Sequence, residues 1–185
     1  MNKSRLEAFT DAIIAIAATI MVLELKVPKE PTFFGLLEEW QTLLSYVISF
    51  IFIYIVWFSH HNIFKKAQNI TMRTFLYNGI WLFFLTLVPF TTRWVGSQTE
   101  ATFPEFLYAF IMLMWSLMFE VIDRQILHDN PQALKDPTNS RAYRSALYGG
   151  FILAMIVSFF APVGCLIIMA LTSIILILRM FFIEA

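Results

Sequence analysis

The chain has 185 residues, of which 59% are hydrophobic and 14% are charged, and its formal net charge is zero. An ordinary soluble domain carries about 25% charged residues, so the composition argues against a soluble enzyme, a nucleic-acid-binding domain and a disordered segment. The single cysteine, Cys165, excludes an intrachain disulfide and a thiolate metal cluster. We therefore expect an all-α polytopic membrane protein that is not an enzyme and holds no cofactor.

Long uncharged stretches follow one another along the chain. A membrane-spanning helix needs about 20 mainly apolar residues, because the hydrocarbon layer is about 30 Å thick. Interruptions by charge, proline or glycine, including the turn signal Pro162-Val163-Gly164, divide residues 1–185 into six spans that form a single domain. The expected spans are residues 5–27, 36–64, 73–93, 103–127, 141–161 and 163–183.

Lysine and arginine are distributed unevenly between the two sides of such a bundle. With the N-terminus inside, ten of them lie on the inner side and three on the outer side. Because inner loops of membrane proteins carry an excess of these residues, both termini are predicted to be cytosolic. Asp11 interrupts the first apolar stretch and no small-residue cleavage site follows it, so we do not expect a signal peptide.

The first span has an unusual composition. Only 12 uncharged residues separate Asp11 from Glu24. They cover about 18 Å, which is less than the thickness of the hydrocarbon layer. Five alanines between residues 8 and 18 would allow close helix contacts. We therefore expect the first helix to lie inside the protein, shielded from lipid by the other spans.

One stripe of the first helix is apolar and continuous. Ile16, Thr19, Ile20 and Leu23 fall within an arc of about 100° on a helix. One interpretation is an ordinary packing face. The other is a pore wall, in which copies of the helix from several subunits meet around an axis.

Polar residues are expected on the other side of the same helix. Asp11 lies about 140° from Ile16, so it should face neighbouring helices rather than a pore. His60, Asn78 and Thr10 are predicted to lie at a similar depth. Such a layer is either a structural hydrogen-bond network or a proton-sensitive latch. One carboxylate and one imidazole are too few ligands to favour a metal site.

The start of the chain resembles a known family. Arg5-x-x-x-Phe9-Thr10-Asp11 is similar to the Arg-x-x-x-Phe-Ser-Asp signature of the endosomal/lysosomal potassium channels, transmembrane protein 175, and their prokaryotic relatives. Thr10 replaces the family's serine but keeps the hydroxyl group. The further similarities are Trp57-x-x-His60 in the second span, and Asn78 and Pro89-Phe90 in the third.

The resemblance implies a potassium-permeable channel in the lipid bilayer, with K⁺ as the permeant ion. Prokaryotic members with one such unit form homotetramers, so a homotetramer in a prokaryotic plasma membrane is implied, with no nucleic acid and no soluble partner. The implied hydrophobic gate is a ring of Ile16, with further layers at Ile20 and Leu23. Thr19 has the only hydroxyl group on the stripe, so we expect it to contribute to selectivity together with Ile16, with K⁺ in the pore near the Thr19 hydroxyl. The implied interhelical network consists of Arg5, Phe9, Thr10, Asp11, His60 and Asn78.

Two other functions remain open from the sequence. A proton leak channel or a secondary transporter would use the polar layer around Asp11 and His60. Transporters of this kind usually contain internal repeats, and none is visible here, so a channel is the favoured function.

Overall fold

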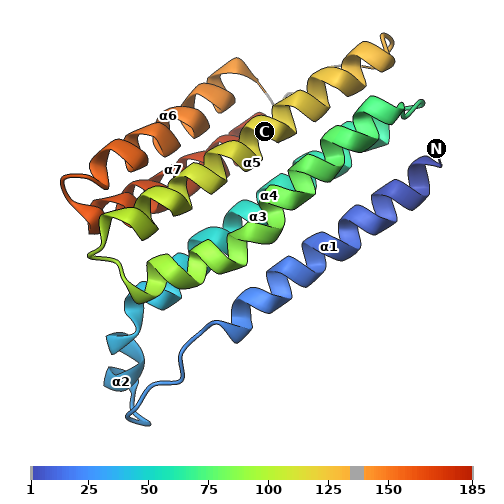
Figure 1. The fold of residues 1–185 in the computed structure, drawn as a ribbon. Helices are drawn as coiled ribbons and strands as arrows, with labels where there is room; N and C mark the ends of the chain where they lie inside the picture. The colour runs from blue at the N-terminus through green and yellow to red at the C-terminus, as the bar shows by residue number, and fades with distance from the viewer. Residues whose placement is uncertain (1, 134–139, 185) are drawn as a thin grey trace.

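The computed structural model of the protein describes residues 2–133 and 140–184, with side chains up to residue 180, and within these ranges it is helical without strands. Figure 1 shows the helices lying side by side in an elongated bundle. The helices are α1 (Lys3–Leu23), α2 (Phe33–Glu38), α3 (Trp40–Lys66), α4 (Met72–Ser97), α5 (Thr102–Asp129), α6 (Arg141–Val157) and α7 (Pro162–Glu184).

Six of these helices are long, which confirms the all-helical membrane architecture expected from the sequence. Five of them, α1, α3, α4, α5 and α7, are long and apolar enough to cross a membrane. α6 has 17 residues and a length of about 26 Å, slightly less than the hydrocarbon thickness. α6 packs closely on α7, and a Cβ at Gly150 of α6 would overlap the Thr172 side chain of α7. The hairpin expected between the last two spans is present, but its turn lies at residues 158–161, and the expected turn residues 162–164 form the start of α7. The protein is therefore an integral membrane protein.

The short helix α2 is an addition to the sequence-based expectation. Residues 36–38 had been assigned to the second span, but they belong to α2, and α3 begins at Trp40. The Thr32 hydroxyl caps α2 by accepting a hydrogen bond from the Gly35 N–H at 3.1 Å. α1 ends at Leu23, four residues before the expected boundary, and the chain continues through Pro28, which cannot extend a helix.

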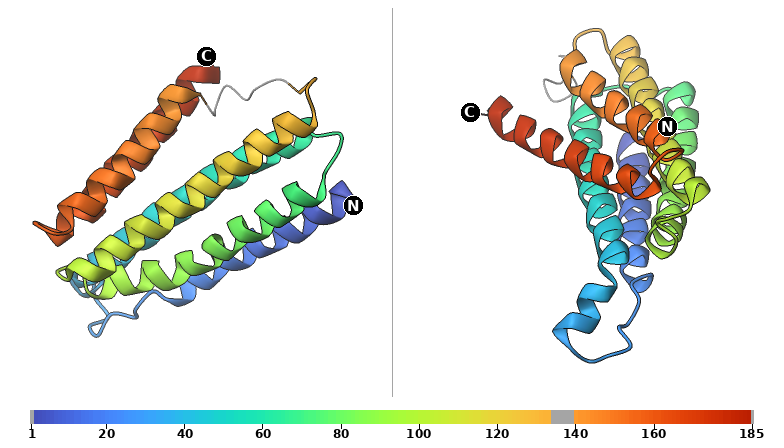
Figure 2. Two further views of the ribbon diagram at one scale, coloured as in Figure 1. Left: turned by 45° about the horizontal axis from the view of Figure 1, so that its top comes forward. Right: turned by 90° about the vertical axis from the view of Figure 1, so that its left-hand side faces the viewer.

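The bundle has α4 near its centre. α4 packs against α5, α3 and α1, while the α6–α7 pair covers α5 and part of α3. Trp81 of α4 and Trp115 of α5 are fully buried in this core. α1 packs mainly on α4 and α3, so it lies at one edge of the bundle, away from α6 and α7 (Figures 1 and 2).

Polar contacts fasten the end of the bundle that carries both termini (Figure 2). The Asn130 side chain at the end of α5 accepts hydrogen bonds from the backbone N–H groups of Gln68 and Asn69, at 2.9 and 2.8 Å. Lys3 of α1 donates to the carbonyl of Ala67 at 2.8 Å. Hence α1 and α5 hold the same α3–α4 connection from two sides.

Ion pairs connect α5 with α6 at the same end. Arg144 contacts Glu120 at 2.7 Å and Asp123 at 2.8 Å, and the Tyr148 hydroxyl donates to Glu120 at 2.6 Å. Arg124 also pairs with Glu120. Residues 134–139 of the α5–α6 connection, which was expected to be a cytosolic connector, lie outside the described residues.

Candidate pore-lining helix

One face of α1 anchors the helix to the bundle. Its buried residues are Leu6, Thr10, Ile14, Ala17 and Met21, which recur every three or four positions. Residues at this spacing lie on one side of a helix. The sequence-based expectation that the other spans shield α1 is therefore wrong for the single subunit, because α3 and α4 cover only this face.

The predicted apolar stripe lies on the uncovered side of α1. Ile16 is 55% exposed and Leu23 is 78% exposed, and Thr19 and Ile20 between them are also exposed. The interpretation of the stripe as a packing face inside the subunit is thus contradicted. An exposed surface of this kind is available to lipid or to other copies of the chain.

The Thr19 hydroxyl is orientated by its own helix. It donates to the carbonyl oxygens of Ala15, at 2.9 Å, and Ile16, at 3.0 Å. The hydroxyl hydrogen is used in these bonds, so the lone pairs of the oxygen are left for an outside partner. These lone pairs can accept a hydrogen bond or coordinate a cation.

A buried chain of hydrogen bonds ties α1 to α4 and α3. The Asn78 amide nitrogen donates to the Thr10 hydroxyl at 2.8 Å, and the Asn78 oxygen lies 3.0 Å from Nε2 of His60. All three side chains are buried. The structure thus brings together three of the six residues of the implied network.

Asp11 takes no part in these hydrogen bonds between Thr10, Asn78 and His60. Its carboxylate accepts a hydrogen bond from the indole N–H of Trp57 at 3.1 Å, on an exposed part of the α1–α3 contact. Because consecutive helical residues point about 100° apart, Thr10 faces the bundle while its neighbour Asp11 faces the edge between α1 and α3. Arg5 and Phe9 are exposed on α1, and within the described part of the chain neither has a side-chain hydrogen bond or ion pair.

The His60 ring belongs to an aromatic stack across the core. Its centroid lies 4.2 Å from that of Phe64 and 4.9 Å from that of Trp81. Trp81 continues the stack to Trp115 at 5.7 Å. These contacts and the bond to Asn78 hold the imidazole inside the core, whereas the Ile16 stripe is exposed.

A second buried polar chain was not expected from the sequence. The Ser49 hydroxyl lies 2.7 Å from that of Thr92 and 2.8 Å from that of Tyr108, which links α3 with α4 and α5. Thr92 also approaches the Met21 sulfur of α1 at 3.9 Å. Isolated hydroxyls in apolar stretches gave no signal for this arrangement.

Charged residues gather at the C-terminal end of α1. Arg93 of α4 pairs with Glu24 at 2.9 Å, and Lys26 lies 4.0 Å from Glu39. Among the described residues no group of three or more His, Cys, Asp or Glu side chains could hold a metal ion. The candidate site is therefore the exposed stripe itself, between the buried hydrogen bonds near the N-terminal end of α1 and the charged residues at its C-terminal end.

Together these features define a class of protein, an integral membrane protein whose first helix is attached by one face and presents an apolar stripe outwards. The sequence model of the endosomal/lysosomal potassium channel TMEM175 matches residues 5–89, which contain the stripe and the residues Thr10, His60 and Asn78. The chain belongs to this family.

Individual relatives extend the similarity beyond the first half of the chain. A potassium channel of Chryseobacterium sp. (strain P1-3) is 33% identical over 166 residues, covering 88% of this chain and 85% of the relative. A crystal structure of a lysosomal potassium-selective channel TMEM175 homologue from Chamaesiphon minutus has a TM-score of 0.82 and 28% identity, covering 96% of this chain and 97% of that one. The endosomal/lysosomal proton channel TMEM175 of Bos taurus is 27% identical over 112 residues, covering 54% of this chain and 23% of the relative.

Proposed function

We propose that this chain forms a potassium-permeable channel, a homotetramer in which four copies of α1 surround the ion path. The observation that carries the proposal is the exposed stripe of Ile16, Thr19, Ile20 and Leu23 on a helix whose opposite face is anchored in the bundle. Rotational symmetry would bring four such stripes together and cover them. The potassium channels among its relatives support K⁺ as the permeant ion.

Ile16 forms the gate in this proposal. Four isoleucine side chains around an axis make an apolar constriction in which an ion loses water and gains no ligand in return, so the closed pore blocks by dewetting. Ile20 and Leu23 add further apolar layers towards the outer end. Opening then requires the α1 helices to move apart or rotate.

Thr19 supplies the oxygen ligands next to the gate. Its hydroxyl hydrogen is held by backbone carbonyls of α1, so four Thr19 oxygens would direct lone pairs towards a K⁺ ion in the pore. A ring of hydroxyl oxygens is weaker than a filter of carbonyl oxygens, so we expect modest selectivity for K⁺ over Na⁺, with K⁺ favoured because it loses water more readily.

The polar anchor of α1 holds the pore wall in place. Thr10, Asn78 and His60 fix the inner half of the helix, and Asp11 with Trp57 fixes its α3 side. Arg5 and Phe9 lie on the exposed part of α1, where other subunits would contact them.

With the N-terminus and the α3–α4 connection in the cytosol, the inner loops carry the excess of Lys and Arg. We therefore place both termini in the cytosol of a prokaryotic cell.

Proton conduction is the second candidate, because animal relatives of the chain are proton channels by name. In this structure the Thr10–Asn78–His60 chain is closed off from the exposed stripe, which disfavours a proton path through it. A proton path along the central pore would use the same Ile16 gate as K⁺.

The test is a flux assay on purified protein in liposomes, with K⁺, Na⁺ and H⁺ gradients compared. Shortening Ile16 to alanine should widen the constriction and raise the K⁺ flux about tenfold, which corresponds to about 1.4 kcal/mol of barrier. The matched control is Ile167→Ala on α7, since Ile167 is 52% exposed and lies far from α1. Equal flux from the two variants would contradict a gate at Ile16.

Thr19 is tested by a pair of substitutions in the same assay. Thr19→Ala removes the oxygen and should lower the K⁺/Na⁺ permeability ratio, whereas Thr19→Ser keeps the hydroxyl and should preserve it. An unchanged ratio in the alanine variant would remove Thr19 from the proposed selectivity site.

A further inference from the structure

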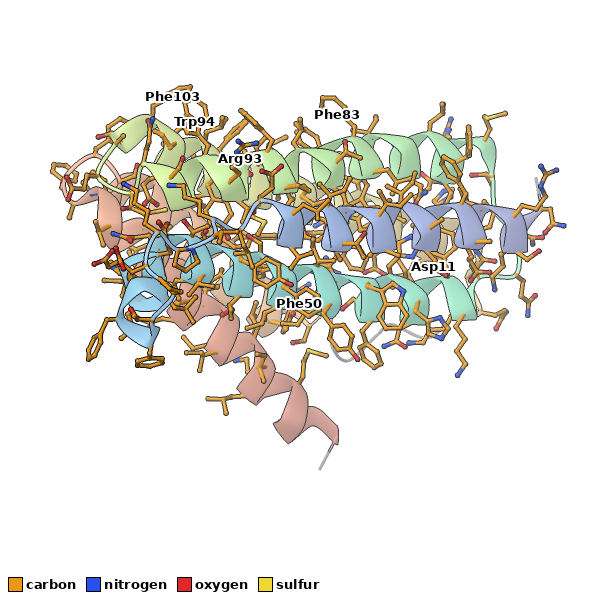
Figure 3. All side chains as sticks on the ribbon, turned by 90° about the horizontal axis from the view of Figure 1, so that it is seen from below. Asp11, Phe50, Phe83, Arg93, Trp94 and Phe103 are labelled. Carbon is orange, nitrogen blue, oxygen red and sulfur yellow. The ribbon has the colours of Figure 1, made fainter. Side chains whose placement is uncertain are left out.

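α1 divides the exposed side of the subunit into two surfaces, an α3 flank formed with α3 and an α4 flank formed by α4. Figure 3 shows α1 in front of the bundle, with Phe50 and Asp11 on its α3 side and Phe83 at the opposite, α4 edge. Subunits related by rotation about one axis contact each other through different surfaces. In a ring closed around α1, the α3 flank of each subunit therefore faces the α4 flank of the next.

The α3 flank is concave. Between α1 and α3 runs a groove of about 350 Å³ whose floor includes the small residues Ala15 and Ala18. Aromatic side chains of α3, among them Phe50, Tyr54 and Trp57, form its rim. Apart from Asp11 the groove is lined by apolar and aromatic side chains, and its volume is large enough to admit an apolar side chain the size of a phenyl ring.

The α4 flank carries a row of exposed apolar side chains. Leu76, Ile80, Phe83 and Phe90 are all exposed, and their spacing places them along one side of α4. Phe83 lies in the middle of this row and is 58% exposed. Large apolar side chains in such a row are the complement of a groove lined by alanines.

The groove and Phe83 lie at the same level along the membrane normal. α1 and α4 run in the same direction, because Thr10 bonds Asn78 near one end and Met21 approaches Thr92 near the other. Counting along the helices from these two contacts places Phe83 level with residues 12–15 of α1. A rotation about the membrane normal leaves depth unchanged, so the Phe83 of a neighbouring copy reaches the level of Ala15, inside the groove.

We propose that Phe83 of each subunit inserts into the α1–α3 groove of the next subunit and so closes the ring around the pore. This inference rests on the proposed tetramer, and it identifies which surfaces of the chain recognise a second copy. The insertion fills the space beside Ala15 and Ala18 and covers Trp57, which separates the Asp11 carboxylate from lipid.

Cysteine cross-linking tests the contact directly. In a Cys165→Ala background, Ala15→Cys and Phe83→Cys together should form disulfides under mild oxidation and give a ladder of up to four chains on a denaturing gel. Within one subunit the two positions lie on opposite flanks of α1, so an intrachain bond does not compete. Each single variant should remain at the position of one chain, because a disulfide requires Cα atoms within about 7 Å.

A second measurement uses the oligomeric state in detergent, determined by native mass spectrometry. Phe83→Ala should shift the protein from tetramers to smaller species, while Phe160→Ala should not, because Phe160 lies in the α6–α7 turn away from α1 and is 85% exposed. Phe83→Leu should restore much of the tetramer.

The outcomes separate the two proposals. A wild-type protein that is not tetrameric would overturn the proposed channel assembly. A tetramer that survives Phe83→Ala and gives no ladder with the cysteine pair would show that lipid occupies the groove, and it would overturn the Phe83 contact alone.

Discussion

Asn78 is the residue on which the attachment of α1 depends most clearly. Its amide bonds Thr10 of α1 and His60 of α3 at once, and all three side chains are buried. Asn78→Leu keeps the approximate volume but removes both bonds, so the Thr10 hydroxyl and the His60 ring nitrogen lose their partner.

The size of the effect follows from these two bonds. A buried polar group left without a partner costs about 1–3 kcal/mol, which gives about 2–6 kcal/mol for two groups. Hydrogen bonds between membrane helices contribute less, about 0.6–2 kcal/mol each. We therefore expect Asn78→Leu to reduce the free energy of unfolding by about 2–4 kcal/mol.

The assay is reversible unfolding by sodium dodecyl sulfate in mixed micelles, followed by circular dichroism. Thr10→Val removes one of the two bonds and should have about half the effect, and the double variant should be less destabilised than the sum, because the residues share a bond. The control is Thr86→Val, since the Thr86 hydroxyl bonds the Phe83 carbonyl of its own helix on an exposed face. A loss in Asn78→Leu no larger than in this control would refute the reasoning.

Two further predictions concern the close packing of Gly96 and the connection between α3 and α4. Gly96→Ala should destabilise the protein by about 1–3 kcal/mol in the same unfolding assay, because the added Cβ would lie 2.5 Å from the Ser45 hydroxyl oxygen. The control is Gly149→Ala, which should not destabilise the protein, because the added Cβ would have no neighbouring atom within 4 Å outside its own helix backbone and adjacent residues. Asn130→Ala removes the side-chain bonds to the α3–α4 connection and should speed amide hydrogen exchange at Asn69 at least tenfold, measured by mass spectrometry; unchanged exchange there would contradict the role given to Asn130.

The six long helices were predictable because their cause is local. Uncharged stretches of sufficient length separate the charged connections, and Pro162 marks the turn of the last hairpin. The break before Trp40 was not predictable in the same way. No proline or glycine stands between α2 and α3, and the contact of Lys26 with Glu39 beside the break is a tertiary interaction.

The site was predictable only in part. Helical geometry alone placed Ile16, Thr19, Ile20 and Leu23 on one stripe, and the structure leaves that stripe exposed. The sequence-based prediction grouped Thr10 and Asp11 because they lie at a similar depth in the membrane. Helical geometry, which turns adjacent residues by about 100°, places them on different faces of α1.

Hydroxyl groups inside spans are the harder case for sequence analysis. Thr91 bonds carbonyls of its own helix, whereas the adjacent Thr92 also reaches Ser49 on another helix. Both are threonines in the same apolar stretch, so only the three-dimensional packing distinguishes them.

The one-sided attachment of α1 has a mechanical consequence. Lys3 at one end, Thr10 further along and Glu24 at the other end each hold α1 to the α3–α4 unit. A pore lined by α1 therefore cannot dilate by bending this helix alone without breaking these bonds. Opening such a pore would require whole subunits to move together with their α1 helices.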